Sequence, residues 1–142
     1  MTENIRAKIL AEALCEINRH GADFHMDDLA RNLRISKRTL YEHSSSKQEI
    51  IQQAISDFTN KIYAYHRRIV SDSTMTCEAK LIAYFDVPSD NWQVLSVRKA
   101  SELLTKMPDV WNRLQSRYEK DWRLLEQLLD EAQETGEFKP FD

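Results

Sequence analysis

The chain has 142 residues, enough for one ordinary domain or for a small head joined to a second helical layer. Only two glycines and three prolines are available for tight turns, which favours an all-helical fold with short connections. A charged fraction of 30% beside a hydrophobic fraction of 42% excludes a disordered chain. Because the formal net charge is −3, any contact with nucleic acid has to come from a local basic face.

The sequence lacks the residues that several functional classes require. No stretch approaches the roughly 18 apolar residues of a membrane span, and no signal peptide precedes the first helix, so we predict a cytoplasmic protein without a membrane partner. Cys15 and Cys77 fall in helical patterns and are expected to be free thiols. The four histidines have no metal-ligand spacing, and no nucleophile–base pair or glycine-rich phosphate loop occurs. We therefore predict no metal, no cofactor and no enzymatic activity.

The first two helices are predicted from apolar periodicity. Apolar residues recur at helical spacing from about Glu3 to Arg19, and Gly21 follows as a helix stop. A second helix begins near Met26, with two aspartates in its first turn, where carboxylates interact favourably with the helix dipole.

The next two helices are predicted from their capping residues. Ser36 is a suitable N-cap for a short third helix that ends near His43. Ser46 and Glu49 have the spacing of a capping box, so a long fourth helix is expected from residue 47 to about residue 71.

Three more helices are predicted downstream, at about residues 75–85, 90–106 and 108–135. The last one carries an apolar stripe formed by Trp111, Leu114, Tyr118, Trp122, Leu125, Leu129 and Ala132.

A basic face covers the third helix and its flanks. Between residues 31 and 47 a single acid, Glu42, accompanies five cations: Arg31, Arg34, Lys37, Arg38 and Lys47. Ile35 and Leu40 point the other way and can anchor the segment in a core. A basic, polar helix on a small apolar base is the form of a DNA recognition element.

The stretch from residue 26 to residue 51 closely resembles the TetR/AcrR family of bacterial transcriptional regulators. The family's signature is found at Leu29-Ala30, Ile35-Ser36, Thr39-Leu40-Tyr41 and Ser46-Lys47. The resemblance covers about residues 5–55. It implies a helix-turn-helix DNA-binding domain at residues 1–46, joined by the long fourth helix to a helical ligand-binding and dimerisation domain at residues 47–142.

The resemblance also implies roles for individual residues. Base edges in the major groove would be approached by Lys37, Arg38 and Thr39, and phosphates would be held by Tyr41, His43 and Lys47. The chemistry agrees, since Arg and Lys suit guanine O6 and N7, and hydroxyl and ammonium groups suit phosphate oxygens. The implied protein is a ligand-responsive repressor that binds double-stranded operator DNA of palindromic sequence as a homodimer.

The implied effector is a small apolar or amphiphilic molecule, and four downstream aromatic residues are candidates for its pocket: Trp92, Trp111, Tyr118 and Trp122. Packing in the core is the competing interpretation for each of them. A helical protein-interaction module that does not read DNA is the alternative function, and salt-dependent binding to duplex DNA would discriminate the two.

The chain departs from the family pattern at three positions. His25 stands where a capping Ser or Thr is usual, Arg34 where the turn usually has Gly, and Ser44 where a Phe usually packs under the recognition helix. Family members also continue past residue 142 with two helices that pair the subunits. The pattern therefore predicts either a truncated chain or a dimer built from other surfaces.

Overall fold

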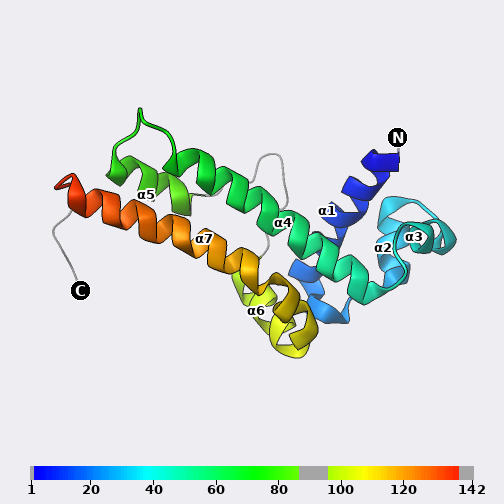
Figure 1. Cartoon of the computed structure of the whole chain (residues 1–142). Coiled ribbons are helices and arrows are strands. Elements are labelled where there is room, and N and C mark those ends of the chain that lie inside the picture. Colours follow the sequence, from blue (N-terminus) through cyan, green and yellow to red (C-terminus); the bar gives the residue numbers. More distant parts are fainter. Residues whose placement is uncertain (1, 87–95, 138–142) are drawn as a thin grey trace. The chain divides into compact units, whose positions relative to one another are not determined.

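The computed structural model describes residues 2–86 and 96–137, and every regular element within these ranges is helical (Figure 1). This confirms the predicted all-α fold. The elements are α1 (Thr2–His20), the short 3₁₀ turn η1 (Gly21–Asp23), α2 (Met26–Leu33), α3 (Lys37–His43), α4 (Lys47–Val70), α5 (Cys77–Phe85), α6 (Val97–Lys106) and α7 (Pro108–Glu134). None of the helices in this part of the chain combines the length and apolar character needed to cross a membrane.

The chain forms two compact units. Unit 1 comprises Met1–Phe58 and Ser89–Arg113, and unit 2 comprises Thr59–Pro88 and Leu114–Asp142. Because α4 and α7 are long, each of them contributes to both units. The division predicted at residue 46 concerns function rather than packing, and it stays a prediction.

In unit 1, α1 packs against α2, η1 and α6, and α2 packs against α3. Gly21 ends α1 with a φ of +63°, a left-handed conformation that glycine adopts without steric cost, as the sequence predicted. The fully buried side chains Ile17, Leu29 and Leu40 come from α1, α2 and α3 respectively. These three helices therefore share one small core, and α3 is anchored in it through Leu40.

Two helices begin later than the approximate starts predicted for them, and a capping side chain precedes each of these later starts. α5 begins at Cys77 rather than at residue 75, since the Thr76 hydroxyl accepts a hydrogen bond from the Ala79 amide at 3.1 Å. α6 begins at Val97 rather than near residue 90, since Ser96 is its N-cap. Residues 90–95, with the predicted Trp92, lie outside the described residues.

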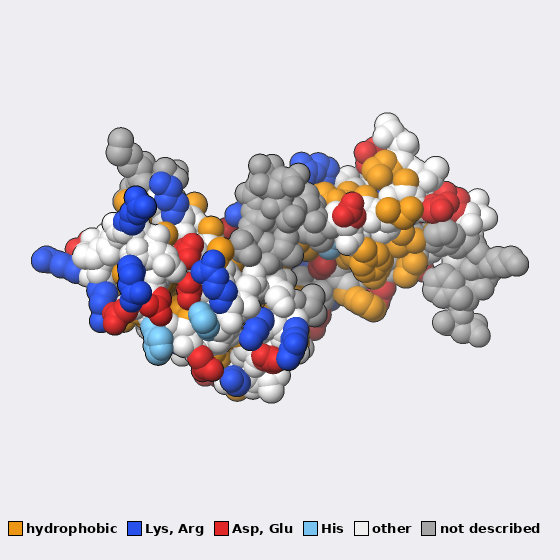
Figure 2. Space-filling view, turned by 180° about the vertical axis from the view of Figure 1, so that it is seen from behind, with side chains coloured by type: hydrophobic (Ala, Val, Ile, Leu, Met, Phe, Trp, Pro, Cys, Tyr) orange, Lys and Arg blue, Asp and Glu red, His pale blue; other side chains and the backbone are white. Residues whose placement is uncertain are grey.

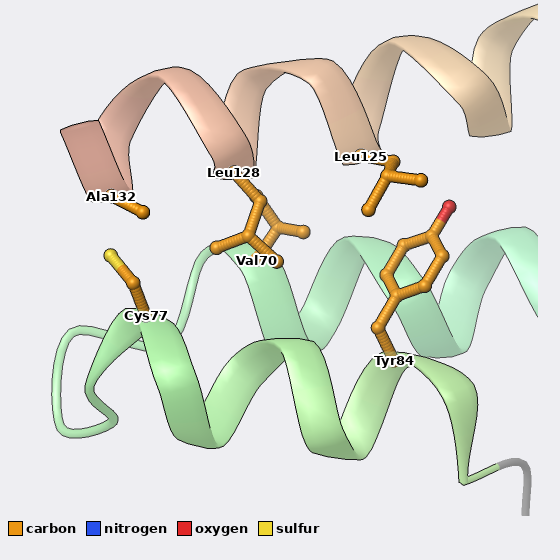
Figure 3. Packing of buried hydrophobic residues seen from close by; sticks show 6 residues of the cluster. All are labelled: Val70, Cys77, Tyr84, Leu125, Leu128 and Ala132. Carbon is orange, nitrogen blue, oxygen red and sulfur yellow. The ribbon is translucent and has the colours of Figure 1, made fainter. Parts of the chain in front are cut away.

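The core of unit 2 is one layer of side chains between α4, α5 and α7 (Figure 3). It consists of Val70, Cys77, Tyr84, Leu125, Leu128 and Ala132. The predicted apolar stripe of α7 was only partly right. Leu114, Leu125 and Ala132 are buried, but Trp111 and Trp122 are exposed. At 3.6 residues per turn both tryptophans lie to one side of the face that packs against α4 and α5.

A buried polar cluster joins the three helices of unit 2. The His66 side chain on α4 places Nδ1 2.6 Å from Asp121 Oδ1 on α7 and Nε2 2.8 Å from the Tyr84 carbonyl oxygen on α5. The His66 and Tyr84 rings stack with centroids 3.6 Å apart, and the Tyr84 hydroxyl donates to the Asp121 carbonyl at 2.9 Å. Burial in this cluster raises the pKa of Tyr84. No sequence pattern predicts this cluster, because His66 and Asp121 are 55 residues apart.

Candidate nucleic-acid interface

The turn between α2 and α3 is closed by backbone hydrogen bonds. Arg34 has φ +57° and ψ +41°, and its amide donates to the carbonyls of Ala30 and Arg31 in the last turn of α2. Arg34 thus occupies a left-handed backbone position that would favour the glycine usual in this turn. At the other end of α2, His25 provides the N-cap position without a side-chain hydrogen bond.

α3 has one buried and one exposed side. Leu40 is fully buried beneath the helix, whereas Lys37 and Arg38 are exposed and Tyr41 has an exposed fraction of 43%. His43 is half-buried in the last turn. The structure thus places five of the six predicted DNA contacts, Thr39 included, on one short helix whose opposite side is anchored in the core.

Thr39 is part of the N-terminal cap of α3. Its amide donates to the Ser36 Oγ at 3.0 Å, and its own hydroxyl oxygen lies 2.9 Å from that oxygen, accepting a hydrogen bond from it. The Thr39 hydroxyl hydrogen therefore stays available to an acceptor outside the protein.

Three cations of this face form ion pairs within unit 1. The pairs are Lys37 Nζ–Asp27 Oδ1 at 2.8 Å, Arg38 Nε–Glu42 Oε1 at 3.5 Å and Arg31 Nη2–Asp28 Oδ1 at 2.8 Å. Figure 2 shows the resulting surface of unit 1, where acidic side chains lie among the basic ones. The hydrogen bond from the Lys37 ammonium lowers the pKa of Asp27 and raises that of Lys37. Exposed pairs of this kind are weak, so phosphate can replace the carboxylate.

Lys47 is the first residue of α4. Its Nζ lies 4.6 Å from the ring centroid of Phe24, which is buried, and partial burial lowers the pKa of the Lys47 ammonium. A cation at a helix N-terminus opposes the helix dipole. An anion beside Lys47 would relieve that opposition and would also meet the free amides of the first turn.

The start of α4 differs in one detail from the predicted capping box. The Ser46 Oγ accepts from the Glu49 amide at 3.1 Å, as expected, so Ser46 is the N-cap. The Glu49 carboxylate, however, accepts from the amide and the hydroxyl of Ser45 instead of from Ser46. These hydrogen bonds lower the pKa of Glu49.

Ser44, which follows α3, is buried, and its Oγ has no hydrogen-bond partner within the described part of the chain. An unsatisfied buried hydroxyl costs roughly 1–3 kcal/mol. We therefore expect Ser44→Ala to raise the free energy of unfolding by about 1 kcal/mol in urea denaturation. Ser45→Ala is the matched control and should be neutral or destabilising, because the Ser45 hydroxyl donates to Glu49. A Ser44→Ala protein less stable than the wild type would show that this hydroxyl has a partner.

The predicted effector residues are not gathered at one described site. Trp111 belongs to unit 1 and has an exposed fraction of 37%, whereas Tyr118 and Trp122 belong to unit 2. Trp122 is 61% exposed, and partial burial raises the pKa of Tyr118. A hollow of about 510 Å³ in unit 1 is lined by Ser46, Gln48, Glu49, Gln52, Gln53 and Arg113. This polar lining does not fit an apolar effector.

Comparison with known proteins agrees with the geometry of the first half of the chain. Residues 9–54, which contain most of α1, all of α2 and α3 and the start of α4, match the family described as bacterial regulatory proteins, tetR family. Over 127 residues the chain is 28% identical to a Bacillus subtilis (strain 168) protein named as an uncharacterized HTH-type transcriptional regulator, YvaF. That alignment covers 89% of this chain and 67% of the relative. No solved structure matches the chain significantly.

A buried helical base, a tight turn and an exposed basic helix, together with these matches, define a helix-turn-helix DNA-binding transcriptional regulator. These matches support a regulator of the TetR family, whose model covers residues 9–54 of this chain.

Proposed function

We propose that α3 enters the major groove of operator DNA. Base edges are approached by Lys37, Arg38 and Thr39, and backbone phosphates are bound by Tyr41, His43 and Lys47. The observation that carries this proposal is the two-sided character of α3, in which Leu40 is fully buried while the basic residues face outward. Lys47 adds a cation at the start of α4, where an adjacent phosphate would be stabilised by the helix dipole.

The proposed regulator acts as a homodimer on a palindromic operator. Two copies related by a two-fold axis would present two α3 helices to successive half-sites. Unit 2 supports self-association because Ile82, Phe85 and Trp122 have exposed fractions of 65%, 70% and 61%. Figure 2 shows hydrophobic side chains gathered on the visible face of this unit. We call these three residues the apolar face of unit 2.

The apolar face lies where α5 and α7 meet. Phe85 follows Tyr84, and Trp122 follows Asp121, and the Tyr84 hydroxyl is hydrogen-bonded to the Asp121 carbonyl at 2.9 Å. The Tyr84 and Phe85 rings have centroids 5.3 Å apart. Both exposed aromatic residues thus directly follow a residue of the same contact between the helices, and we propose that a second copy covers them.

Repression by this protein follows from occupancy of the operator. A small apolar or amphiphilic effector would act by binding the helices of unit 2 near Tyr118 and Trp122 and favouring a conformation with lower DNA affinity. Such an effector can shift the equilibrium only by as much as its affinity differs between the two conformations.

DNA binding can be tested by fluorescence anisotropy with duplexes from the regions that flank the coding gene. Lys37→Ala, Tyr41→Ala and Lys47→Ala are each expected to weaken binding about tenfold, because each removes a proposed contact to a base or a phosphate. Lys47→Ala should do so equally on all sequences, whereas Lys37→Ala should also reduce discrimination between operator and unrelated DNA.

Arg123→Ala is the control, since Arg123 is an exposed cation on α7 in unit 2. Its affinity for DNA should equal that of the wild type. Unchanged affinity in all three test variants would contradict the proposed interface. A wild-type protein that binds no duplex at any salt concentration would favour the helical interaction module instead.

A further inference from the structure

We propose that Arg34, in the turn between α2 and α3, is an additional DNA-contacting residue that binds a backbone phosphate next to the recognition helix. This inference rests on the proposed DNA-binding function and adds a residue to the contact set given above. Three observations support it: the backbone conformation of Arg34, the state of its charge and its position beside α3.

The backbone at Arg34 is strained. It is the only non-glycine residue with positive φ in the part of the chain that the structure describes. The conformation is imposed by the turn, because the Arg34 amide must reach the carbonyls of Ala30 and Arg31 to close α2. Glycine would meet the same requirement without strain, because it has no Cβ that could clash with the backbone. Strain that persists at such a position is characteristic of functional sites.

The charge of Arg34 is uncompensated, unlike that of the cations around it. Arg31, Lys37 and Arg38 each form an ion pair with a carboxylate of unit 1, and Lys47 lies over the Phe24 ring. Within residues 2–86 and 96–137, the exposed Arg34 guanidinium has no hydrogen-bond or ion-pair partner. A phosphate at a paired cation must first displace a carboxylate, whereas Arg34 offers its full charge.

The position of Arg34 suits a phosphate rather than a base. It lies two residues before the α3 N-cap Ser36 and three before Lys37, so its Cα is within about 10 Å of that of Lys37. The first residues of a recognition helix meet base edges, and the turn that precedes the helix therefore lies near the edge of the groove. The planar guanidinium can bind a phosphate through two parallel hydrogen bonds.

Arg34→Gly removes the charge and also relieves the backbone strain. Two different measurements report these two effects, the salt dependence of DNA binding and the Tm. In anisotropy titrations over a range of salt concentrations, the slope of log K against log[salt] should become shallower by about 0.9 per protomer. At 0.1 M salt this corresponds to about eightfold weaker binding per protomer. The Tm should rise by about 2–4 °C because of the relieved strain. Arg34→Lys keeps the charge and should retain most of the salt dependence.

Arg34→Asn is a second neutral variant, since asparagine tolerates the left-handed conformation. It replaces the glycine variant if the latter unfolds at a lower temperature than the wild type. Arg123→Ala controls for a general loss of positive charge. The inference is overturned if Arg34→Gly binds with wild-type affinity and salt slope while Lys47→Ala weakens binding, a result that leaves the proposed function intact. A wild-type protein that binds no duplex overturns both.

Discussion

Asp121→Ala is expected to destabilise unit 2 by about 2–3 kcal/mol, because it breaks the buried polar cluster of α4, α5 and α7. The Tyr84 carbonyl can only accept a hydrogen bond, so Nε2 of His66 must carry its hydrogen. Among the described residues, the other ring nitrogen is paired only with the Asp121 carboxylate, 2.6 Å away. Removal of that carboxylate leaves a polar nitrogen without a partner on a side chain that is 6% exposed.

The loss can be measured by urea denaturation followed by circular dichroism. Asp121→Asn keeps a hydrogen-bonding group at this position and should lose about half as much stability. Asp130→Ala removes an exposed carboxylate from the same helix and should change the free energy of unfolding by less than about 0.5 kcal/mol. If Asp121→Ala were as stable as Asp130→Ala, the cluster would make no net contribution to stability.

Phe85→Glu and Trp122→Glu are expected to weaken self-association by at least about a hundredfold, because each places a charge in the proposed contact between two copies. The apolar face of unit 2 exposes on the order of 400 Å² of side chain, given the usual areas of these residues. Two such faces with their surroundings approach the roughly 1,000 Å² that a specific interface requires. Because a dimer occupies both half-sites, the operator affinity of these variants should fall as their dimerisation weakens.

Sedimentation velocity over a range of protein concentrations measures this effect. Gln127→Glu introduces the same charge on α7 but five residues after Trp122, and therefore on another side of the helix. It should sediment as the wild type does. A wild-type protein that stays monomeric at all concentrations, or a Phe85→Glu protein that associates as well as Gln127→Glu, would contradict the proposed dimer face.

The first half of the chain could be predicted from sequence because its signals act within one helical turn. Ser36 and Ser46 cap α3 and α4 through hydrogen bonds to amides three residues away, and Gly21 ends α1 through its own backbone conformation. The sequence likewise identified Arg34 as the residue that replaces the usual glycine of the turn, and the structure shows that its φ is positive. These local signals are also the ones that carry the family resemblance.

The exposure of the aromatic residues downstream was decided only by tertiary structure. Periodicity identifies an apolar stripe on α7 but cannot say which side of it α4 and α5 will cover, and this leaves Trp122 exposed while Leu128 is buried. The same holds for contacts between distant residues. Nothing local links His66 to Asp121, or shows that Asp27 holds Lys37, since such pairs form only when separate helices are packed together. The sequence by itself therefore determined the all-helical character of the chain, the basic character of α3 and the resemblance to the TetR family. The packing of the helices decided which charges are compensated and which apolar side chains stay exposed.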